Sequence, residues 1–555
     1  MFADMRRHIF LLVGGLLLCT SAMAQSNATT GLVFDRDILS APSINSFAQR
    51  DYMGTARSMA MGGAFTSLGA DMASLGVNPA GFGMYQHNDI SVTFGLGVHR
   101  AENSGVLGAD NNLNSQTRFS VNNIGASFKV YEGTGDLLAI NFAFGYNKVA
   151  DYNYNLNYHG ASGNASIADA FADIANRNGL GINSDNHICD QAGYADYDMN
   201  PYYWSTALAY KGRLINRVGN SWYPDEIGAN ASIDQFSRVK SRGSAGEFSL
   251  AVGFNVKNIL YIGASLDIQS ISRTQTIYYG ENISYAEGAA PDPTAMPYQL
   301  REFTLAQQMR VSGTGVGAKF GIVVRPVKSL RIGFAVHTPT YYSVSYSYKG
   351  AIDSVCNSTG TNPENYNLVG GKLYASADTP ELTDSGSYGW EFTTPTRLLA
   401  GISYTISKYA IISADYEYDA FRATRITSAP LNYDFINSDL KYGFRNQHIV
   451  RAGIEAKPLP IMALRVGGGY LWRVTNDKDP IFTEPVRNGG WYCSAGLGFR
   501  VSRVVSIDVA YQFRHNDYTK YDTYYSENDL GVNSSPIYGL DMDNHNIALT
   551  FGFKF

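Results

Sequence analysis

Apolar and polar residues alternate over long stretches of this 555-residue chain, and this alternation limits the folds that are open to it. From Phe248 to Ile268 every second residue is apolar on both sides of the dipeptide Lys257-Asn258, and the residues between them are mostly polar or small. A period of two places one kind of side chain on each face of a β-strand. The pattern is typical of a strand between lipid and a lumen, and equally of a strand in a β-sandwich.

The lengths of the connections separate these two folds. Connections after even-numbered candidate strands are short, as at Ser407-Lys408, whereas those after odd-numbered strands run from about a dozen residues to nearly 80. Short periplasmic turns and long extracellular loops are typical of bacterial outer-membrane barrels. The sequence therefore predicts an all-β fold, a transmembrane antiparallel β-barrel of about 14 strands over residues 88–555. The candidate strands are 88–100, 117–131, 137–152, 232–257, 259–277, 303–326, 329–348, 388–406, 409–425, 445–457, 461–474, 489–502, 504–518 and 545–555.

The long connections are predicted to be extracellular loops at about 153–231, 278–302, 349–387 and 519–544. Charged residues make up only 16 % of the chain, with 56 Gly and 39 Tyr, which suits antiparallel strands and turns better than a helical enzyme. The net charge of −5 gives no reason to expect nucleic acid as a partner.

The first 24 residues have the pattern of a secretory signal peptide. Arg6 and Arg7 precede the apolar run 9–18, and Ala22-Met23-Ala24 supplies a cleavage site. We therefore expect residues 1–24 to be removed on export from the cytoplasm of a Gram-negative cell. No later stretch reaches the ~18 apolar residues that a spanning helix needs.

The last candidate strand carries a second export feature, because its apolar residues alternate up to the terminal Phe555. An alternating aromatic strand that ends in Phe resembles the assembly signal of outer-membrane barrels. We expect the barrel-assembly machinery and outer-membrane lipids as partners, and a monomeric protein in the outer membrane.

Residues 25–87 lack the strand pattern. The stretch 54–83 is dense in Gly, Ala and Met, and Asn78-Pro79-Ala80-Gly81 has the composition of a tight turn. A segment with so few large apolar residues would not form its own core. Glycine permits close approach of backbones, so we expect residues 25–87 to pack inside the barrel lumen.

Short motifs in this stretch and downstream of it resemble the FadL/TodX family of outer-membrane transporters for hydrophobic compounds. They include Met61-Gly62-Gly63-Ala64, Asn78-Pro79-Ala80-Gly81, 317–321, 337–340 and 413–418. Each motif is short, but their shared order across the chain is specific. The resemblance implies a 14-stranded barrel plugged by an N-terminal hatch, with hydrophobic molecules entering from outside and leaving through a lateral opening in the wall.

The same resemblance implies that the hatch shifts when ligand binds. The alternative, that the Asn78 motif is only a turn that anchors the plug, stays open. For the lateral opening, glycines or a bulge around 141–153 are candidates. The candidate gating residues are Gly62, Gly63, Asn78, Pro79, Ala80 and Gly81.

The longest loop contains a candidate helix at 166–175, in which Ile167, Phe171 and Ile174 recur at helical spacing. The simpler interpretation is an amphipathic helix that packs on its own loop. The other is a cap whose apolar side chains line an external groove for ligand.

Other chemistry has weak support. No nucleophile–base pattern stands out, so we expect no enzyme, no cofactor and no metal. Two histidines of the longest loop, His159 and His187, and His99 near a loop base, have residue types that ligate haem iron, although solvated loop histidines are the simpler interpretation. Pairing of Cys189 with Cys356 is left open.

The leading hypothesis is passive transport of hydrophobic compounds, with long-chain fatty acids or similar lipids as the default substrate. The alternatives are an interaction or secretion platform, a haemin-binding receptor and an open porin. Robust single-channel conductance of the wild-type protein would support the porin and exclude a sealing hatch.

Overall fold

The computed structural model describes the chain from Ser40 to its end, with internal gaps. The predicted signal peptide and the first part of the predicted hatch lie outside it. Within the described residues no helix is long and apolar enough to cross a membrane. The described residues are 40–51, 53–105, 112–163, 166–195, 199, 203–224, 231–285, 298–358, 368–369, 372–378, 387–429, 433–477, 481–482, 484–522 and 537–555.

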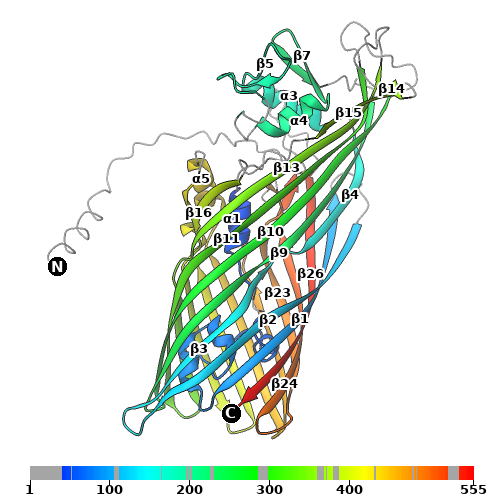
Figure 1. Ribbon diagram of the computed structural model, residues 1–555. Helices are drawn as coiled ribbons and strands as arrows, with labels where there is room; N and C mark the ends of the chain where they lie inside the picture. The colour runs from blue at the N-terminus through cyan, green and yellow to red at the C-terminus, as the bar shows by residue number, and fades with distance from the viewer. Residues whose placement is uncertain are drawn as a thin grey trace, which may run out of the picture.

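The chain forms a closed antiparallel barrel with 14 strand positions (Figure 1), which confirms the predicted fold. Pairing of the last strand with the first closes the ring. Ten positions are single strands: β1 (Asp89–Gly105), β2 (Asn112–Glu132), β9 (Ala231–Val256), β10 (Leu260–Tyr285), β11 (Tyr298–Val327), β20 (Gln447–Leu459), β21 (Met462–Leu471), β23 (Arg487–Arg500), β24 (Val505–Tyr518) and β26 (Ile537–Lys554).

The other four positions are each divided into two strands by a short interruption. Thr338–Thr340 and Thr394–Thr396 interrupt two neighbouring positions side by side, where Thr340 N donates to Thr394 Oγ1 at 3.0 Å. The divided positions are β3 (Leu137–Asp151) with β4 (Tyr154–Gly163), β12 (Leu330–His337) with β13 (Tyr341–Ser358), β16 (Ser387–Thr393) with β17 (Arg397–Ile406), and β18 (Ala410–Asp419) with β19 (Arg425–Ser428).

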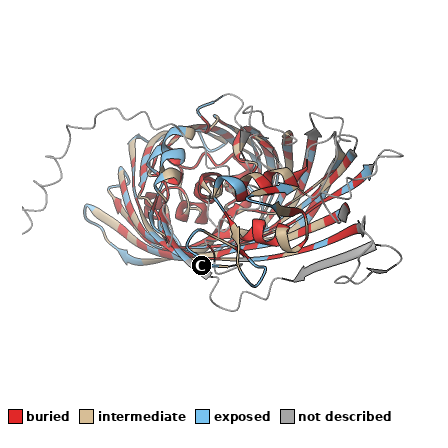
Figure 2. Cartoon of the chain, turned by 90° about the horizontal axis from the view of Figure 1, so that it is seen from above, coloured by how far each residue is buried: buried red, intermediate tan, exposed pale blue. Residues whose placement is uncertain are grey.

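The side-chain distribution is that of a membrane barrel. On β10, Ile262, Leu266 and Ile268 point outward and are 40–52 % exposed, whereas Asp267 points into the lumen and is buried. Figure 2 shows this alternation of buried and exposed residues along the strands. An apolar outer face and a polar interior invert the order of a soluble protein, so the outer face is the one that contacts lipid.

Several strands extend well beyond the membrane. The predicted loop 278–302 begins and ends with strand, because β10 runs to Tyr285 and β11 starts at Tyr298. The last strand likewise starts at Ile537, inside the predicted loop 519–544. Above the lipid both faces of a strand can be polar, so the apolar alternation on which the prediction relied fades there while backbone pairing continues.

A small helical unit, here called the cap, sits at the outer end of the barrel beside the tall wall formed by β9, β10, β11 and β13 (Figure 1). It consists of α3 (Ile167–Arg177), α4 (Trp204–Lys211), the hairpin β5 (Gly181–Ile182) with β6 (Ile188–Cys189), and the hairpin β7 (Ile215–Val218) with β8 (Ser221–Pro224). On the wall, Gln307 Nε2 donates to Ser205 Oγ of the cap at 3.2 Å. Outside the cap, the outer end also contains β14 (Leu368–Val369), β15 (Lys372–Asp378), α5 (Asp434–Gly443), η5 (Phe421–Ala423), β22 (Ile481–Phe482) and β25 (Lys520–Asp522).

Candidate functional site: the hatch and the break in the barrel wall

Residues 53–87 form three short helical turns inside the lower lumen: α2 (Ala56–Ala60), η1 (Met72–Leu75) and η2 (Pro79–Met84). Each turn starts at a side-chain cap, where Thr55 accepts from Ser58 N, Asp71 from Ala73 N and Asn78 from Ala80 N. Caps satisfy N–H groups that so short a helix leaves free. This segment is the described part of the hatch.

Asn78 joins two parts of the hatch. Its Oδ1 accepts from Ala80 N at 3.0 Å, and its Nδ2 donates to Thr66 O at 2.7 Å. Asn78 is fully buried. Gly81 N in turn donates to Asn78 O at 3.0 Å, so the motif is a closed turn pressed against the wall.

The other predicted gating residues, Gly62 and Gly63, have φ values of +63° and +71°. This left-handed conformation strains residues with a Cβ. It lets Gly63 N return to Ser58 O at 2.8 Å and end α2. Gly62 O accepts from Tyr492 OH of β23 at 2.9 Å, so the turn is also bound to the wall.

A ring of wall glycines, here called the glycine ring, lets the hatch backbone lie directly against the strands. A Cβ added at any of these positions would lie less than 3.0 Å from a hatch atom. Gly253, for example, would meet Gly83, and Gly467 would meet Gly62. The glycine ring comprises Gly253, Gly263, Gly321, Gly333, Gly453 and Gly467.

Buried ion pairs hold the hatch and the residues just before it to the wall. Arg57 Nε lies 2.9 Å from Glu455, and Asp51 lies 2.7 Å from Arg514 Nη1. Asp51 also contacts Arg487 at 2.5 Å. Removing one partner of such a pair leaves a buried charge without compensation, which typically costs 3–5 kcal/mol. The hatch is thus fixed in place by charge as well as by shape.

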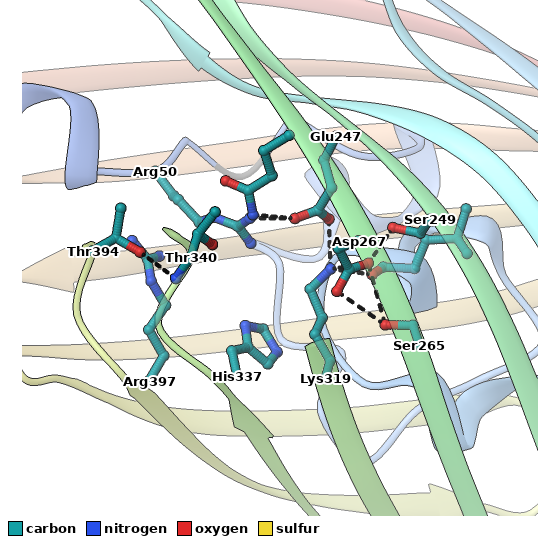
Figure 3. Close-up of polar contacts among 12 residues, drawn as sticks. Arg50, Glu247, Ser249, Ser265, Asp267, Lys319, His337, Thr340, Thr394 and Arg397 are labelled. Carbon is teal, nitrogen blue, oxygen red and sulfur yellow. Dashed lines mark hydrogen bonds and ion pairs between the residues drawn. The ribbon is translucent and has the colours of Figure 1, made fainter. Parts of the chain in front are cut away.

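Figure 3 shows a further cluster where the wall reaches into the lumen. Lys319 Nζ lies 2.5 Å from Glu247 and 2.9 Å from Asp267, and it donates to Leu75 O of the hatch at 2.9 Å. Arg50 pairs with the same Glu247. The sequence motif at 317–321 contained Lys319 without indicating its role. The alternation of the strand already placed Lys319 on the lumenal face, and a charge that faces the lumen needs a partner there. This was the feature of the sequence that could have indicated an ion pair.

Above the hatch the lumen is filled by α1 (Ala41–Ala48), whose apolar side chains pack on an aromatic group while polar and charged side chains line the space around it. The Phe47 ring lies 5.5 Å from that of Tyr152 and 6.3 Å from that of Phe392, which stacks on Tyr342 at 5.1 Å. These four rings are here called the aromatic cluster. Ile44 of the same helix is fully buried.

The barrel wall is broken beside this cluster. Pairing of β2 with β3 ends at Asn123 and Asn147. Beyond that point β2 pairs with β1 and not with β3, and β3 and β4 pair with β9, among the strand residues that the structure describes. On the outer side Phe119, at the β2 edge of the break, is 69 % exposed, and the exposed Phe248 of β9 pairs with Tyr146 just below the break, so the break begins at the outer edge of the lipid-facing surface. The interruption falls within the predicted region 141–153.

A lumenal cavity lies behind the break. Its lining includes Asp151, Tyr152 and Asn153, which join β3 to β4, together with His99 of β1. The cavity volume is about 50 Å³. A cavity of roughly 150 Å³ holds benzene, so the described conformation is closed to a hydrophobic ligand at this point.

A family model for outer-membrane transport proteins, OMPP1/FadL/TodX, matches residues 230–555. The chain belongs to this family. It is similar to three solved structures: a Pseudomonas aeruginosa FadL homologue (12 % identity, 89 % of this chain and 96 % of that one, TM-score 0.49), the P. putida toluene transporter TodX (11 %, 91 % and 99 %, 0.49) and the Ralstonia pickettii toluene transporter TbuX (14 %, 91 % and 99 %, 0.45). No curated protein matches the chain.

In this FadL/TodX-family barrel the three candidate groove residues of the longest loop lie inside the cap. Ile167 and Phe171 are fully buried and Ile174 is 9 % exposed. Helix α3 packs against α4, β7 and β8. Access of a ligand to these side chains would require the cap to open.

The candidate haem and disulfide residues are engaged elsewhere. His159 pairs with Asp234 at 2.9 Å, and His99 Nδ1 lies 2.9 Å from Asn544 Oδ1. No disulfide joins Cys189 to Cys356, both of which the structure describes. Within the described residues no group of three or more His, Cys, Asp or Glu side chains is placed to hold a metal ion.

In this member of the FadL/TodX family, Glu281 of β10 binds the cap to the tall wall by hydrogen bonds. Glu281 Oε1 accepts from Ile167 N at 2.9 Å and from Tyr279 OH at 2.6 Å, and Oε2 accepts from Ser166 Oγ at 2.5 Å. The carboxyl therefore sits at the N-terminus of α3, where a negative charge is favourable.

We expect docking of the cap to depend on pH. Glu281 lies above the lipid-facing part of β10, and burial raises the pKa of its carboxyl from 4.5 to about 7 despite these hydrogen bonds. A raised acid pKa means that docking is strongest below about pH 4.5 and weakens as the pH rises to about 7, by on the order of 3 kcal/mol. Hydrogen exchange of the α3 amides, corrected for intrinsic rates, should show less protection at pH 8 than at pH 5. Glu281→Gln should remove this difference; an unchanged difference in the variant would contradict the assignment.

Proposed function

We propose that this protein carries hydrophobic molecules, with long-chain fatty acids as the default substrate, passively across the outer membrane under control of its hatch. The observation that carries the proposal is the break between β2 and β3, which lies between the lipid and the aromatic cluster of a plugged barrel. A plugged barrel with an opening toward lipid suits an apolar solute better than a polar one.

Physical chemistry favours a lateral route. The polar lipopolysaccharide layer is a barrier to hydrocarbon chains, and burial of each CH₂ in an apolar site recovers roughly 0.8 kcal/mol. A molecule that enters the upper lumen and leaves through the break reaches the membrane without crossing the hatch. The hatch meanwhile prevents leakage of polar solutes.

In this proposal α1 occupies the ligand site of the resting protein. Phe47 fills the space between Tyr152 and Phe392. The cavity behind the break is too small for ligand, so Phe47 must move for a ligand to pass. The hatch motif at Asn78 would shift with it, because Asn78 N-caps η2 and binds Thr66.

Native mass spectrometry of the detergent-purified barrel tests ligand class. We expect the protein to retain one labelled oleate in preference to haemin, and Asn78→Ala to weaken retention several-fold by loosening the hatch. Asn282→Ala, at an exposed outward position on β10, is the matched control. Absence of retained lipid together with a co-purifying protein partner would instead support the interaction platform.

A further inference from the structure

The outer face of the tall wall carries a group of basic side chains, here called the basic band. Its members are Arg238, Lys240 and Arg242 on β9, Arg310 on β11 and Lys349 on β13. All are exposed or half-buried. The alternate residues of the same strands point inward, so the band faces away from the lumen.

The basic band lies just outside the lipid-facing surface. Phe248, Ile268, Val316 and Tyr341 pair in sequence across four strands and are 50–65 % exposed. They are the last exposed apolar residues of their strands before the band. Arg242 lies six residues beyond Phe248, and Arg310 lies six residues beyond Val316.

The geometry of a tilted strand gives the height of the basic band above the row of apolar residues. Six residues at ~3.3 Å each, on a strand tilted by roughly 40°, rise about 15 Å along the membrane normal. The headgroup region adds roughly 5–8 Å to each side of the hydrocarbon core. The backbone of Arg242 and Arg310 therefore lies roughly 7–10 Å beyond a headgroup layer of this depth. Long basic side chains extend their charged ends toward the membrane, so these two guanidinium groups can reach the sugars and phosphates at the outer edge of the headgroups.

The surface between the apolar row and the basic band is rich in hydroxyl groups. Outward positions there carry short neutral side chains that donate and accept hydrogen bonds, as sugars do. No carboxylate lies among these positions. The hydroxyl-bearing residues are Ser244, Ser270, Ser272, Thr274, Thr276, Ser312, Thr314, Ser343, Ser345 and Ser347.

The cations of the basic band on β9 and β11 form no ion pair with another described residue. In the described part of the chain, none of Arg238, Lys240, Arg242 and Arg310 forms an ion pair, in contrast to the paired cations of the lumen. The acidic side chain further out on β9, Asp234, pairs with His159 instead. Guanidinium groups without partners on a fixed surface favour phosphate, which they bind through two hydrogen bonds.

We propose that the basic band binds the phosphate groups of the outer-leaflet glycolipid, with the hydroxyl-rich surface against its sugars. The opposite outer face, on β24, β26 and β1, is acidic, with Asp517, Asp541, Asp543 and Glu102. The bound glycolipid therefore lies on one side of the barrel. This role does not depend on which substrate the protein transports.

Titration of the purified full-length mature barrel with bis-phosphorylated lipid A, and with the same lipid A after enzymatic dephosphorylation, tests the proposal. We expect at least tenfold tighter binding of the phosphorylated lipid. The triple variant Lys240→Gln, Arg242→Gln, Arg310→Gln should lose this preference. A matched triple variant in the periplasmic turns, Lys328→Gln, Lys408→Gln, Arg503→Gln, has the same change in charge and should bind within twofold of wild type.

Equal wild-type affinity for the two lipids would overturn the proposal without recourse to any variant. So would a triple variant that keeps the phosphate preference. A concentration-dependent dimer that the triple variant abolishes, with no preference for phosphate, would show that the band meets the acidic face of a second copy and would also overturn it.

Discussion

Replacement of Gly467 by leucine is expected to convert the sealed barrel into a conducting pore. A Cβ at this position already lies less than 3.0 Å from Gly62 N and from two atoms of Met61, and leucine adds three more carbons. Overpacking in a dense interior typically costs 1–3 kcal/mol or more. Because the wall is fixed by strand pairing on both sides, we expect the hatch to move.

Planar-bilayer recording measures this effect directly. The wild-type protein should show no porin-like steps, whereas Gly467→Leu should show discrete openings. Gly389→Leu on β16 is the matched control, since nothing lies within 4 Å of a Cβ added there. Silent bilayers with correctly folded Gly467→Leu protein would mean that the hatch absorbs the added volume and that the glycine ring does not position it.

A covalent link across the break should reduce oleate uptake at least tenfold. A link across an intact part of the wall should not reduce it. Asn157 of β4 donates to Asn114 Oδ1 of β2 at 2.7 Å, so these side chains face one another across the break. Cysteines at both positions, in a background with Cys189, Cys356 and Cys493 replaced by serine, can be joined by a short cleavable reagent. Oleate uptake should fall when the link forms and return when it is cleaved.

The control pair lies where the wall is continuous. Thr276 and Gln308 are outward neighbours on β10 and β11, with a side-chain hydrogen bond of 3.4 Å. Linking cysteines at these positions should leave uptake unchanged. Loss of uptake in both pairs would indicate that any stiffening of the barrel is inhibitory, and normal uptake in both would exclude the break as the exit.

The pattern of neighbouring residues in the sequence was enough to predict much of the fold. Each of the 14 predicted segments overlaps one strand position of the barrel, and the helix expected at 166–175 is α3 (Ile167–Arg177). Both features depend on the alternation or spacing of neighbouring residues. The turn that joins β9 to β10 has positive φ at both of its central residues, Lys257 and Asn258, as a type I′ turn between paired strands requires.

The site was less accessible from sequence, because it depends on pairs of distant residues. Gly467 and Gly62 are separated by some 400 residues, and neither position alone shows that the other is near. The break is a relation between β2 and β3 that the sequence of one strand does not contain. Glu247 and Lys319 could be seen in the sequence as charged residues within strands of alternating pattern. That Glu247 pairs with both Lys319 and Arg50 became apparent only in the closed barrel.

The glycine ring also sets the order in which the molecule can assemble. The hatch is made early, yet the glycine ring is spread over β9 to β21, and further hatch contacts come from Tyr492 of β23 and Thr550 of β26. The binding surface of the hatch is therefore complete only after the last strand has joined. The ring then closes through β1 and β26, which lie at opposite ends of the barrel sequence. The hatch therefore cannot complete its packing before the last strands have joined, and the closure that pairs β1 with β26 also encloses the hatch in the lumen.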